Sequence, residues 1–403
     1  MAALAAALAT ASAGAARAAS SPTLPRLHAK AAILVEPATG DVVYARHAMQ
    51  RRPIASTTKL MTALLTVERE PLGKVLVAAP YHPMPAESVI GLKAGERLTV
   101  ADLLRGLLLA SANDAAETLA VDIAGSRQRF VALMNARARQ LGLRATHYAN
   151  PIGLDQPGNY STAEDLVKLA LLLRRDRFAR EVMNRPSTIL YSGAHPRRIA
   201  NRNTLVSEVA SVDGVKTGHT HDAGYVLVGS ATRHGVNVVS AVLGEPTEEA
   251  RDADTLALLR YGLGRYRLVQ ALRAGQPLGS APVKGRSGRR VGLLAGATLT
   301  RTIALGDRLR TRLAGVPGAV SGPLRRGARV GTVEVLRRGR VVARAPLVLA
   351  AAVPAPPART GAILAAALAA LATALATGSL VLVLLRRRAV RRRRRRAGST
   401  GTA

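Results

Sequence analysis

Hydrophobic residues follow two different spacings along this chain. In the N-terminal half they recur at helical intervals, as in Leu60 and Leu64, and the same periodicity runs through residues 130–141 and 163–173. Such spacing predicts helices with one buried face. Further along, short apolar runs alternate with turn residues, a pattern typical of consecutive β-strands. These later elements are strands at 212–218, 224–231 and 236–243 and a helix at about 250–262.

A β-hairpin is predicted near the start of the chain. The apolar segments 31–35 and 42–45 flank the turn-forming sequence Glu36-Pro37-Ala38-Thr39-Gly40-Asp41. Helices inserted between an N-terminal hairpin and three later strands are typical of an α/β (α+β) sandwich whose hairpin joins an antiparallel sheet. We therefore expect one such domain over residues 27–266.

The segment 267–352 has a different pattern, with short apolar runs separated by frequent Gly and Pro. Strands are expected at 289–294, 299–304, 329–336 and 341–349. The segment carries no cluster of Ser, His, Asp or Glu that suggests chemistry. We therefore expect a small all-β domain that serves as a spacer or an interaction module.

A membrane anchor is predicted near the C-terminus. A Pro-rich linker at 353–360 precedes residues 361–385, which are 25 residues without a charge, enough for a helix to cross a bilayer. Nine arginines then occur within the tail, residues 386–403, and the positive-inside rule places that tail in the cytoplasm with the preceding domains outside. Because the first half of this segment is mostly alanine, an alanine-rich tail helix is the alternative.

Residues 1–20 are alanine-rich and apolar, with small-residue sites such as Ala11-Ser12-Ala13. This resembles a secretory signal, although no Lys or Arg precedes the apolar stretch as is usual for one. A disordered alanine-rich leader is the alternative.

Composition narrows the possible partners. The chain has 403 residues, a formal net charge of +33, no cysteine and only 2% aromatic residues. Disulfides are therefore excluded, and the positive charge favours anionic wall polymers and lipid head groups. A nucleic-acid partner is not expected, because aromatic residues for base stacking are scarce and the arginine block follows a membrane span.

Candidate chemistry begins at Ser56-Thr57-Thr58-Lys59, where a basic stretch meets an apolar run. We expect a helix that opens at Ser56, with Lys59 one turn later on the same face. A lysine whose pKa is lowered by burial or by a nearby cation can take the proton of a serine hydroxyl. Taken alone, the tetrapeptide also fits a helix cap followed by a surface lysine.

Two further motifs follow in a fixed order. Ser111-Ala112-Asn113 and Lys216-Thr217-Gly218 complete a trio that is typical of β-lactamases and penicillin-binding proteins. We expect a helix that is capped at Thr99 and ends near Ser111, and a second helix that begins at Asp114, so that Ser111 and Asn113 lie on a short connection.

Residues 28–265 resemble the D-alanyl-D-alanine carboxypeptidases, the low-molecular-weight penicillin-binding proteins of serine peptidase family S11. The resemblance rests on the trio with its flanking residues and on Asn201-Arg202-Asn203, and the segment 267–350 resembles the C-terminal domain of the same family. It implies the sandwich fold of serine β-lactamases and penicillin-binding proteins, followed by the all-β domain and one transmembrane helix.

The resemblance also implies catalytic roles. Ser56 would attack the carbonyl of the terminal D-Ala-D-Ala bond with Lys59 as the base, and Ser111 would relay a proton to the leaving amine. The backbone N–H groups of Ser56 and His219 would form the oxyanion hole. No cofactor is expected.

Substrate binding is implied in the same way. Asn113 would hold the substrate backbone, and Lys216 and Thr217 would bind its terminal carboxylate, which Arg202 would also contact. Gly218 would let the ligand approach the strand closely. The expected partners are peptidoglycan stem peptides, β-lactams as covalent inhibitors, and the cytoplasmic membrane.

Some features depart from the family patterns. Class A β-lactamases have Ser-Asp-Asn in the second motif and deacylate with a glutamate in a Glu-x-x-x-Asn loop, which is missing between Asn113 and Lys216. Efficient β-lactam hydrolysis is therefore not expected. Ile152 stands where many relatives carry a polar residue, which leaves the substrate preference open.

Two rival interpretations remain at this point. A non-catalytic wall-binding protein could keep the same fold, although all motif residues of the trio are present. His219-Thr220-His221-Asp222 could suggest a metal site, but two histidines without a third spaced ligand are a weak signal, and a serine mechanism needs no metal.

Overall fold

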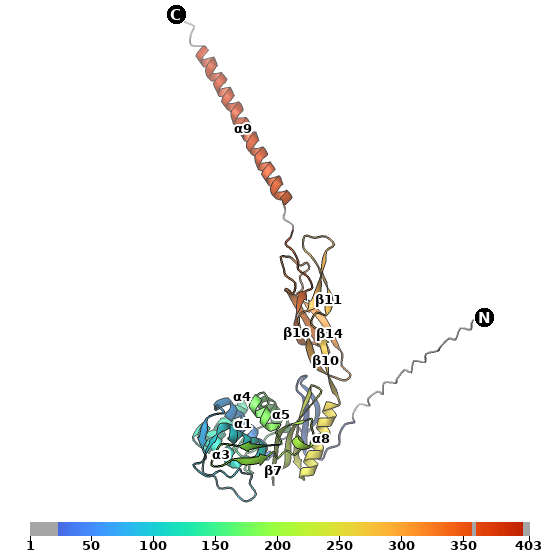
Figure 1. Cartoon of the computed structure of the whole chain (residues 1–403). Coiled ribbons are helices and arrows are strands. Elements are labelled where there is room, and N and C mark those ends of the chain that lie inside the picture. Colours follow the sequence, from blue (N-terminus) through green and yellow to red (C-terminus); the bar gives the residue numbers. More distant parts are fainter. Residues whose placement is uncertain (1–22, 357–359, 398–403) are drawn as a thin grey trace, which may run out of the picture. The chain divides into compact units, whose positions relative to one another are not determined.

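The computed structural model describes residues 23–356 and 360–397. The signal-like segment 1–20 lies outside the described residues, as do residues 357–359 of the predicted linker and residues 398–403 of the tail. The described chain forms two compact units (Figure 1). The first unit comprises residues 23–271 together with Thr300–Arg308, and the second comprises Leu272–Leu299 and the chain from Leu309 onward.

The first unit is built on a five-stranded antiparallel sheet in the order β2-β1-β9-β8-β7. Its strands are β1 (Ala31–Glu36), β2 (Asp41–Arg46), β7 (Val212–Thr220), β8 (Gly224–Arg233) and β9 (Val236–Glu245). The predicted hairpin is confirmed, and it joins the sheet because β1 pairs with β9. The antiparallel sheet of the expected fold class is therefore present.

Helices cover both faces of this sheet (Figure 1). The helices of this unit are α1 (Lys59–Arg69), α2 (Val100–Arg105), α3 (Asn113–Ala124), α4 (Arg127–Gln140), α5 (Ala163–Leu173), α6 (Arg177–Met183), α7 (Leu205–Glu208) and α8 (Glu248–Leu263). Side chains of successive strand residues point to opposite faces. Ile33 accordingly packs in a core with α1, α3 and α5, and Leu34 packs in a second core with Leu258 and Leu259 of α8.

Two helix boundaries differ from those expected. A 3₁₀ turn, η1 (Ala55–Thr58), precedes α1, so the helix does not open at Ser56. The helix capped by Thr99 changes into a π-helical turn, η2 (Gly106–Ala110), and α3 begins at Asn113 rather than at Asp114. Apolar periodicity does not distinguish these local variants from a regular α-helix.

Several short elements were not expected from the sequence. Two antiparallel pairs are formed by β3 (Val75–Val77) with β4 (Arg97–Thr99) and by β5 (Ser187–Leu190) with β6 (Arg197–Ala200). Strands of three or four residues are too short to show a period of two. The predicted strand at 299–304 is confirmed as β13 (Leu299–Ala304), and it pairs with β10 (Tyr266–Leu272), which was not expected. Because β13 pairs with β10, most of β13 belongs to the first unit, although its sequence lies within the segment 267–352 that was expected to form the all-β domain.

The second unit contains a five-stranded antiparallel sheet in the order β11-β12-β16-β15-β14, and the all-β prediction is confirmed. The strands are β11 (Pro277–Pro282), β12 (Arg290–Ala295), β14 (Leu309–Ala314), β15 (Arg329–Arg337) and β16 (Arg340–Leu349). Val333 and Val335 are buried on one face, while Glu334 between them accepts hydrogen bonds from Arg312 and Arg344. Cross-strand pairs of this kind stabilise a sheet face that is open to water.

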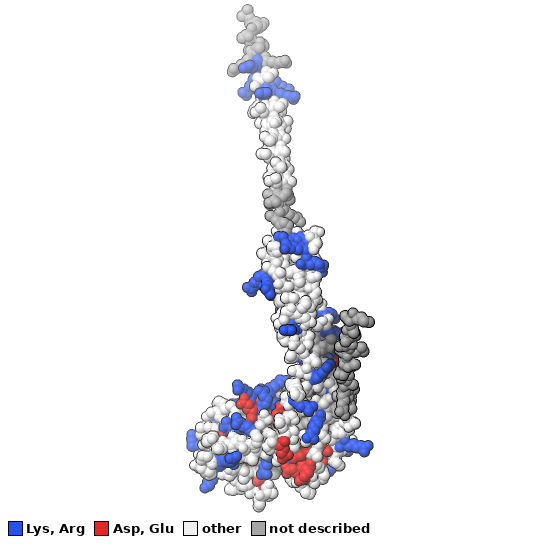
Figure 2. All heavy atoms as spheres, turned by 45° about the vertical axis from the view of Figure 1, so that its right-hand side comes forward, with Lys and Arg blue, Asp and Glu red and all other residues white. Residues whose placement is uncertain are grey.

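The helix α9 (Thr360–Ala397) spans the predicted anchor. Within it, Leu364–Arg393 is the one helical segment among the described residues that is long and apolar enough to cross a membrane, and its side chains are exposed. Figure 2 shows Lys and Arg side chains distributed widely over the surface, whereas most of the visible Asp and Glu side chains gather on the first unit.

Candidate active site

Ser56 and Lys59 are brought together by the 3₁₀ turn η1. Because a 3₁₀ helix has three residues per turn, side chains at i and i+3 lie one above the other. Lys59 Nζ lies 2.9 Å from Ser56 Oγ and donates a second hydrogen bond of 2.5 Å to the carbonyl oxygen of Ile152. The Lys59 side chain is fully buried. The turn therefore places an amine against the serine hydroxyl and holds it there.

The surroundings favour the uncharged form of Lys59. Burial lowers the pKa of Lys59 well below its usual value, and the positive charge of Lys216 lowers it further, against the opposing effect of Glu87 and Asp114. Burial also lowers the pKa of Lys216 to about 7, with contributions from Arg202 and Arg251. A neutral amine beside Ser56 Oγ can accept its proton, so the pair has the electrostatics of a nucleophile with its base.

Two glycines let the backbone close around Ser56. A Cβ on Gly218 of β7 would lie 2.9 Å from the Ser56 nitrogen, and a Cβ on Gly153 would lie 2.1 Å from the Ala55 carbonyl oxygen. Gly153 also has a φ of +88°, which disfavours other residues. Neither position can take a larger residue unless β7 or the 150–155 loop moves away from the serine.

Ser111 ends the π-helical turn η2 in a left-handed conformation, with a φ of 62°. Its Oγ is buried and has no hydrogen-bond partner among the residues that the structure describes. An unpaired buried hydroxyl is costly, and such groups are often kept for a ligand. The hydroxyl lines the same cavity as Ser56.

Asn113 lies in the first turn of α3 and is held by an acidic loop residue. Its Nδ2 donates a 2.8 Å hydrogen bond to Glu87 Oε2, which also accepts from the Tyr81 hydroxyl. Burial opposes ionisation of Glu87, but these two hydrogen bonds, a third from the Met84 backbone and the nearby Lys59 together lower its pKa. Glu87 was not expected from the sequence, because it lies in a loop without periodicity.

Two cavities meet at Ser56. The first, here called the cationic cavity, has a volume of about 270 Å³ and is lined by Ser56, Ala86, Ser88, Ser111, Arg202, Thr217, Gly218, His219, Tyr225, Glu248 and Arg251. The second, here called the loop cavity, has a volume of about 490 Å³ and is lined by Ser56, Met84, Ala86, Glu87, Ser88, Asn113, Gly153, Leu154, Asp155, His219, Thr220 and His221. Lys216 is buried on β7 and donates to the Thr217 carbonyl at 3.0 Å. Ser56, Ser111, Asn113, Arg202, Thr217, Gly218 and His219 thus each line at least one of the cavities, whereas Lys59 and Lys216 are buried and line neither.

Arg202 reaches the cationic cavity from the chain that follows β6. Its backbone N–H donates a 3.0 Å hydrogen bond to the Leu109 carbonyl, which ties this chain to the turn that carries Ser111. The Arg202 side chain is exposed. A cation thus lies at the rim of the cavity that contains Ser56 and Ser111.

Arg251 is a site residue that sequence reasoning missed. It lies in the second turn of α8, is 3% exposed, and donates to Glu248 at 2.7 Å and to Asp252 at 2.8 Å while lining the cationic cavity. A buried cation so near a helix N-terminus is unfavourable, since that end favours anions. A positively charged residue close to the predicted start of a helix could have drawn attention to Arg251, but no sequence motif includes it.

His221 does not form a metal centre in the described structure. The described residues contain no group of three or more His, Cys, Asp or Glu side chains arranged to hold a metal ion. His221 is exposed, and its Nδ1 lies 3.1 Å from Asp222 Oδ1.

Comparison with known proteins points to one family. A family model described as D-alanyl-D-alanine carboxypeptidase matches residues 16–247. The carboxypeptidase DacA of Escherichia coli K12 is 33% identical, over 83% of this chain and 85% of the relative, and DacF of Bacillus subtilis 168 is 29% identical, over 79% and 84%.

Solved structures give the same result. Penicillin binding protein 5 of Haemophilus influenzae is similar with a TM-score of 0.60 and 29% identity, covering 83% of this chain and 99% of that chain. The Streptomyces K15 DD-transpeptidase is similar with a TM-score of 0.55 and 30% identity, covering 60% of this chain and 99% of that chain. The shorter coverage of the second match agrees with a chain that carries additional residues beyond a peptidase-like unit.

Proposed function

Because the chain belongs to the S11 peptidase family of D-alanyl-D-alanine carboxypeptidases, it is a serine-type D-Ala-D-Ala carboxypeptidase, and we propose that Ser56 is its nucleophile and Lys59 its base. The family removes the terminal D-alanine of peptidoglycan stem pentapeptides through an acyl-enzyme and is sensitive to penicillin. The observation that carries the assignment is the 2.9 Å contact between Ser56 Oγ and the fully buried Lys59 amine. No observation favours an inactive wall-binding scaffold.

Acylation follows from the geometry of the serine and lysine. The neutral Lys59 amine takes the proton of Ser56, and Ser56 Oγ bonds to the carbonyl carbon of the penultimate D-alanine. The backbone N–H groups of Ser56 and His219 stabilise the oxyanion. Ser111, whose Oγ is otherwise unpaired in the described chain, passes a proton to the departing nitrogen as the carbon–nitrogen bond breaks. Water then hydrolyses the ester and restores Ser56.

The leaving D-alanine carries a free carboxylate, and the cationic cavity suits it. Thr217 and the guanidinium groups of Arg202 and Arg251 line this cavity, and Lys216 lies behind Thr217. Charge-assisted hydrogen bonds to a carboxylate are stronger than neutral ones. Asn113 lines the loop cavity on the other side of Ser56, where it can hold the backbone of the acyl part of the peptide.

β-Lactams acylate the same serine, and their carboxylate would take the place of the D-alanine carboxylate. The loop between Asn113 and Lys216 lacks the Glu-x-x-x-Asn pattern with which class A β-lactamases activate water. We therefore propose that the penicilloyl enzyme is long-lived, so that β-lactams act as covalent inhibitors.

The location of the enzyme is part of this proposal. The apolar part of α9 anchors the chain in the cytoplasmic membrane, and its following arginines keep the tail on the cytoplasmic side. Both compact units then lie outside the membrane, where peptidoglycan is found. The second unit serves as a spacer between the anchor and the catalytic unit.

The proposal is tested by release of D-alanine from an acetylated peptide that ends in D-Ala-D-Ala. The full chain in detergent is expected to release one D-alanine per peptide, whereas Ser56→Ala is expected to release none above background. Thr57→Ala is a matched control in the same turn, because its hydroxyl donates to the Ile54 carbonyl and not toward Lys59. Equal release by wild type and Ser56→Ala would contradict the assignment of the nucleophile.

A further inference from the structure

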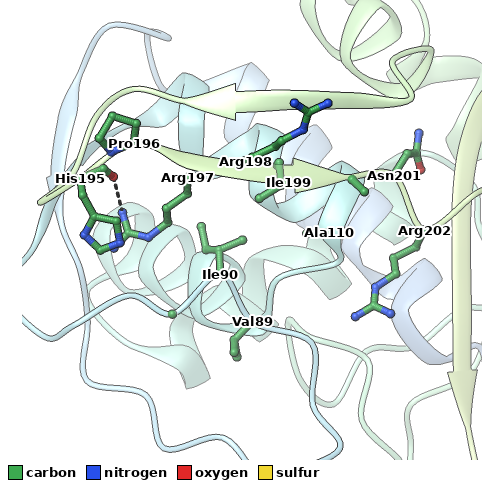
Figure 3. Close-up of a pocket in the computed structure, with 12 residues that line it drawn as sticks. Val89, Ile90, Ala110, His195, Pro196, Arg197, Arg198, Ile199, Asn201 and Arg202 are labelled. Carbon is green, nitrogen blue, oxygen red and sulfur yellow. Dashed lines mark hydrogen bonds between the residues drawn. The ribbon is translucent and has the colours of Figure 1, made fainter.

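Several arginines of the first unit are held by acidic side chains. Figure 3 shows one of them, Arg197, in a hollow beside β6, where it donates to both oxygens of Glu96 at 2.7 and 2.8 Å. The second unit differs, because its residues 272–299 and 309–356 contain fourteen Lys and Arg but a single acid, Glu334. Most of its positive charge is therefore not balanced within the unit.

The chain leaves the sheet of the second unit at one end, here called the exit end, which consists of residues 283–289, 320–328 and 350–356. After β16, Val353 and Leu324 exchange two backbone hydrogen bonds, at 2.8 and 2.9 Å. Arg286 Nη2 donates to the Ala355 carbonyl oxygen at 3.4 Å. These contacts hold the β11–β12 turn and the loop before β15 against the last residues of the sheet.

Positive charge gathers at the exit end without any acid. Its residues include no Asp or Glu. Figure 2 shows Lys and Arg side chains at the end of this unit from which the chain continues to α9. Four exposed cations there have no side-chain hydrogen bond or ion pair within the described residues, namely Lys284, Arg289, Arg325 and Arg326. They can bind an external anion without giving up a partner in the protein.

A short linker keeps the exit end near the membrane. Gly361, where the uncharged segment begins, follows Ala355 by six positions in the sequence. An extended chain spans at most about 3.5 Å per residue, so the exit end lies within roughly 20 Å of the start of the predicted span. Under the proposed location, these cations are therefore tethered close to lipid head groups.

We propose that the exit end binds anionic lipid head groups of the membrane that anchors the chain, through Lys284, Arg289, Arg325 and Arg326. This inference rests on the location given in the proposed function. Guanidinium and ammonium groups form charge-assisted hydrogen bonds to phosphate, and a surface of anionic lipids attracts each nearby cation. With α9 as one attachment and the exit end as a second, the second unit is an oriented spacer rather than a freely pivoting one.

Position favours lipid over an anionic wall polymer as the partner. The opposite end of the sheet, at and beside the β15–β16 hairpin, also carries exposed arginines, namely Arg310, Arg338 and Arg340. A wall polymer can approach from any side and would contact both ends. The exit end is the one that the short linker ties to the span. The opposite arginines therefore provide a control with the same charge at a different position.

Lipid nanodiscs with nitroxide-tagged head groups test the proposal. The chain has no cysteine, so Ser287→Cys places a single fluorophore at the exit end, and Thr311→Cys on β14 places one toward the opposite end. The full chain is compared in discs of phosphatidylcholine and in discs of equal amounts of phosphatidylcholine and phosphatidylglycerol. Quenching at position 287 is expected to be stronger in the anionic discs and to weaken with added salt, and quenching at position 311 to be weak in both.

Arginine substitutions supply the specific readout. Each cation beside an anionic lipid surface favours contact by about fivefold, so Arg289→Gln, Arg325→Gln and Arg326→Gln together should lower the ratio of bound to unbound exit ends about 100-fold. Quenching at position 287 should then fall to its value in neutral discs. A matched triple variant removes the same charge from the opposite end and should leave this quenching unchanged: Arg310→Gln, Arg338→Gln and Arg340→Gln. Release of D-alanine at the wild-type rate checks that both variants are folded.

Equal quenching at position 287 in the two kinds of disc, or an equal loss in the two triple variants, would overturn the inference while D-alanine release leaves the carboxypeptidase intact. Loss of quenching on adding soluble poly(glycerol phosphate), at the phosphate concentration of the lipid, would assign the exit end to a wall polymer instead. A full chain that does not remain with neutral discs would overturn the anchoring in the proposed function and this inference with it.

Discussion

The two cavities that meet at Ser56 differ in the charge and the origin of their walls. The cationic cavity takes Arg202 and Arg251 from segments that are remote in sequence, and Lys216 lies behind it. The loop cavity has no Lys or Arg in its lining and instead presents Met84 and Leu154 beside acidic side chains. Ser56 thus lies between a cavity with two arginines in its lining and a cavity with no Lys or Arg in its lining.

This difference gives the substrate a direction. A peptide with a free C-terminal carboxylate gains charge-assisted hydrogen bonds only when that end enters the cationic cavity. Its acyl part then lies in the loop cavity, where contacts are mainly of shape. Recognition of the leaving group is therefore expected to be strong and specific, and recognition of the acyl part to be weaker and more tolerant.

The largest loss of activity is expected from a substitution of Lys59, which contacts Ser56, a residue that lines both cavities. Lys59→Met should lower kcat/KM by about 10³-fold for every substrate, because a general base typically contributes about 10²- to 10⁴-fold. Steady-state kinetics on the acetylated D-Ala-D-Ala peptide and the rate of penicillin acylation measure this loss. Lys93→Met, an exposed lysine outside both cavities, should behave as wild type. A loss confined to one class of substrate would contradict a common base.

A smaller effect is expected from Lys216→Gln, and its signature is a change in pH dependence. In wild type, kcat/KM should rise with pH as Lys59 loses its proton and fall above about pH 7 as Lys216 becomes neutral and attracts carboxylate less. The variant should lose about tenfold to 100-fold at neutral pH, the range for a hydrogen bond to a charged group.

The two limbs of that profile should respond differently. The falling limb should disappear in Lys216→Gln. The rising limb should move to higher pH, because the like charge that lowers the Lys59 pKa is gone, but only in part, since burial is the larger cause. Unchanged limbs in the pH profile of the variant would show that Lys216 is not coupled to the base.

Substitution of Arg202, at the rim of the cationic cavity, should lower activity less than substitution of Lys216. Arg202→Gln is expected to raise KM for a carboxylate-ending peptide about fivefold, because exposed charges contribute roughly 1 kcal/mol or less. The same peptide with an amidated C-terminus should be cleaved equally slowly by wild type and variant. Arg198→Gln is the matched control, since Arg198 is exposed nearby but does not line the cationic cavity. An equal loss on both peptides would mean that Arg202 acts on structure rather than on the carboxylate.

The smallest effect is expected in the loop cavity. Met84→Ala should lower kcat/KM about threefold or less for peptides with a long acyl part, because Met84 is 63% exposed and can bury only part of its side chain. Met49→Ala, which removes an even more exposed methionine outside the cavity, should have no effect. A loss of activity in Met84→Ala larger than that in Arg202→Gln would mean that the loop cavity contributes more to substrate recognition than the cationic cavity.

The parts of the site that could be predicted are those determined by local sequence. The spacing of Ser56 and Lys59 gives proximity in any helical turn, and a glycine at 218 anticipates a close backbone approach on a strand. The hairpin, the sheet and the later helices followed from apolar periodicity. Resemblance to a family then joined motifs that lie far apart in the chain.

The remaining parts depend on contacts that periodicity does not encode. Arg251 enters the site only because α8 packs against the sheet, and Glu87 reaches Asn113 only because a long loop folds over the start of α3. The left-handed conformation of Ser111 depends on the π-helical turn before it. In each case a residue is positioned by tertiary packing against an irregular segment, and the local sequence carries little sign of it.

The location of the acyl group tests the central claim most directly. The full chain is incubated with penicillin, digested, and analysed by mass spectrometry for the modified residue. The account predicts one penicilloyl adduct, on Ser56, that is absent from Ser56→Ala and forms far more slowly in Lys59→Met. An adduct on Ser111, or on any residue other than Ser56, would contradict the assignment of nucleophile and base.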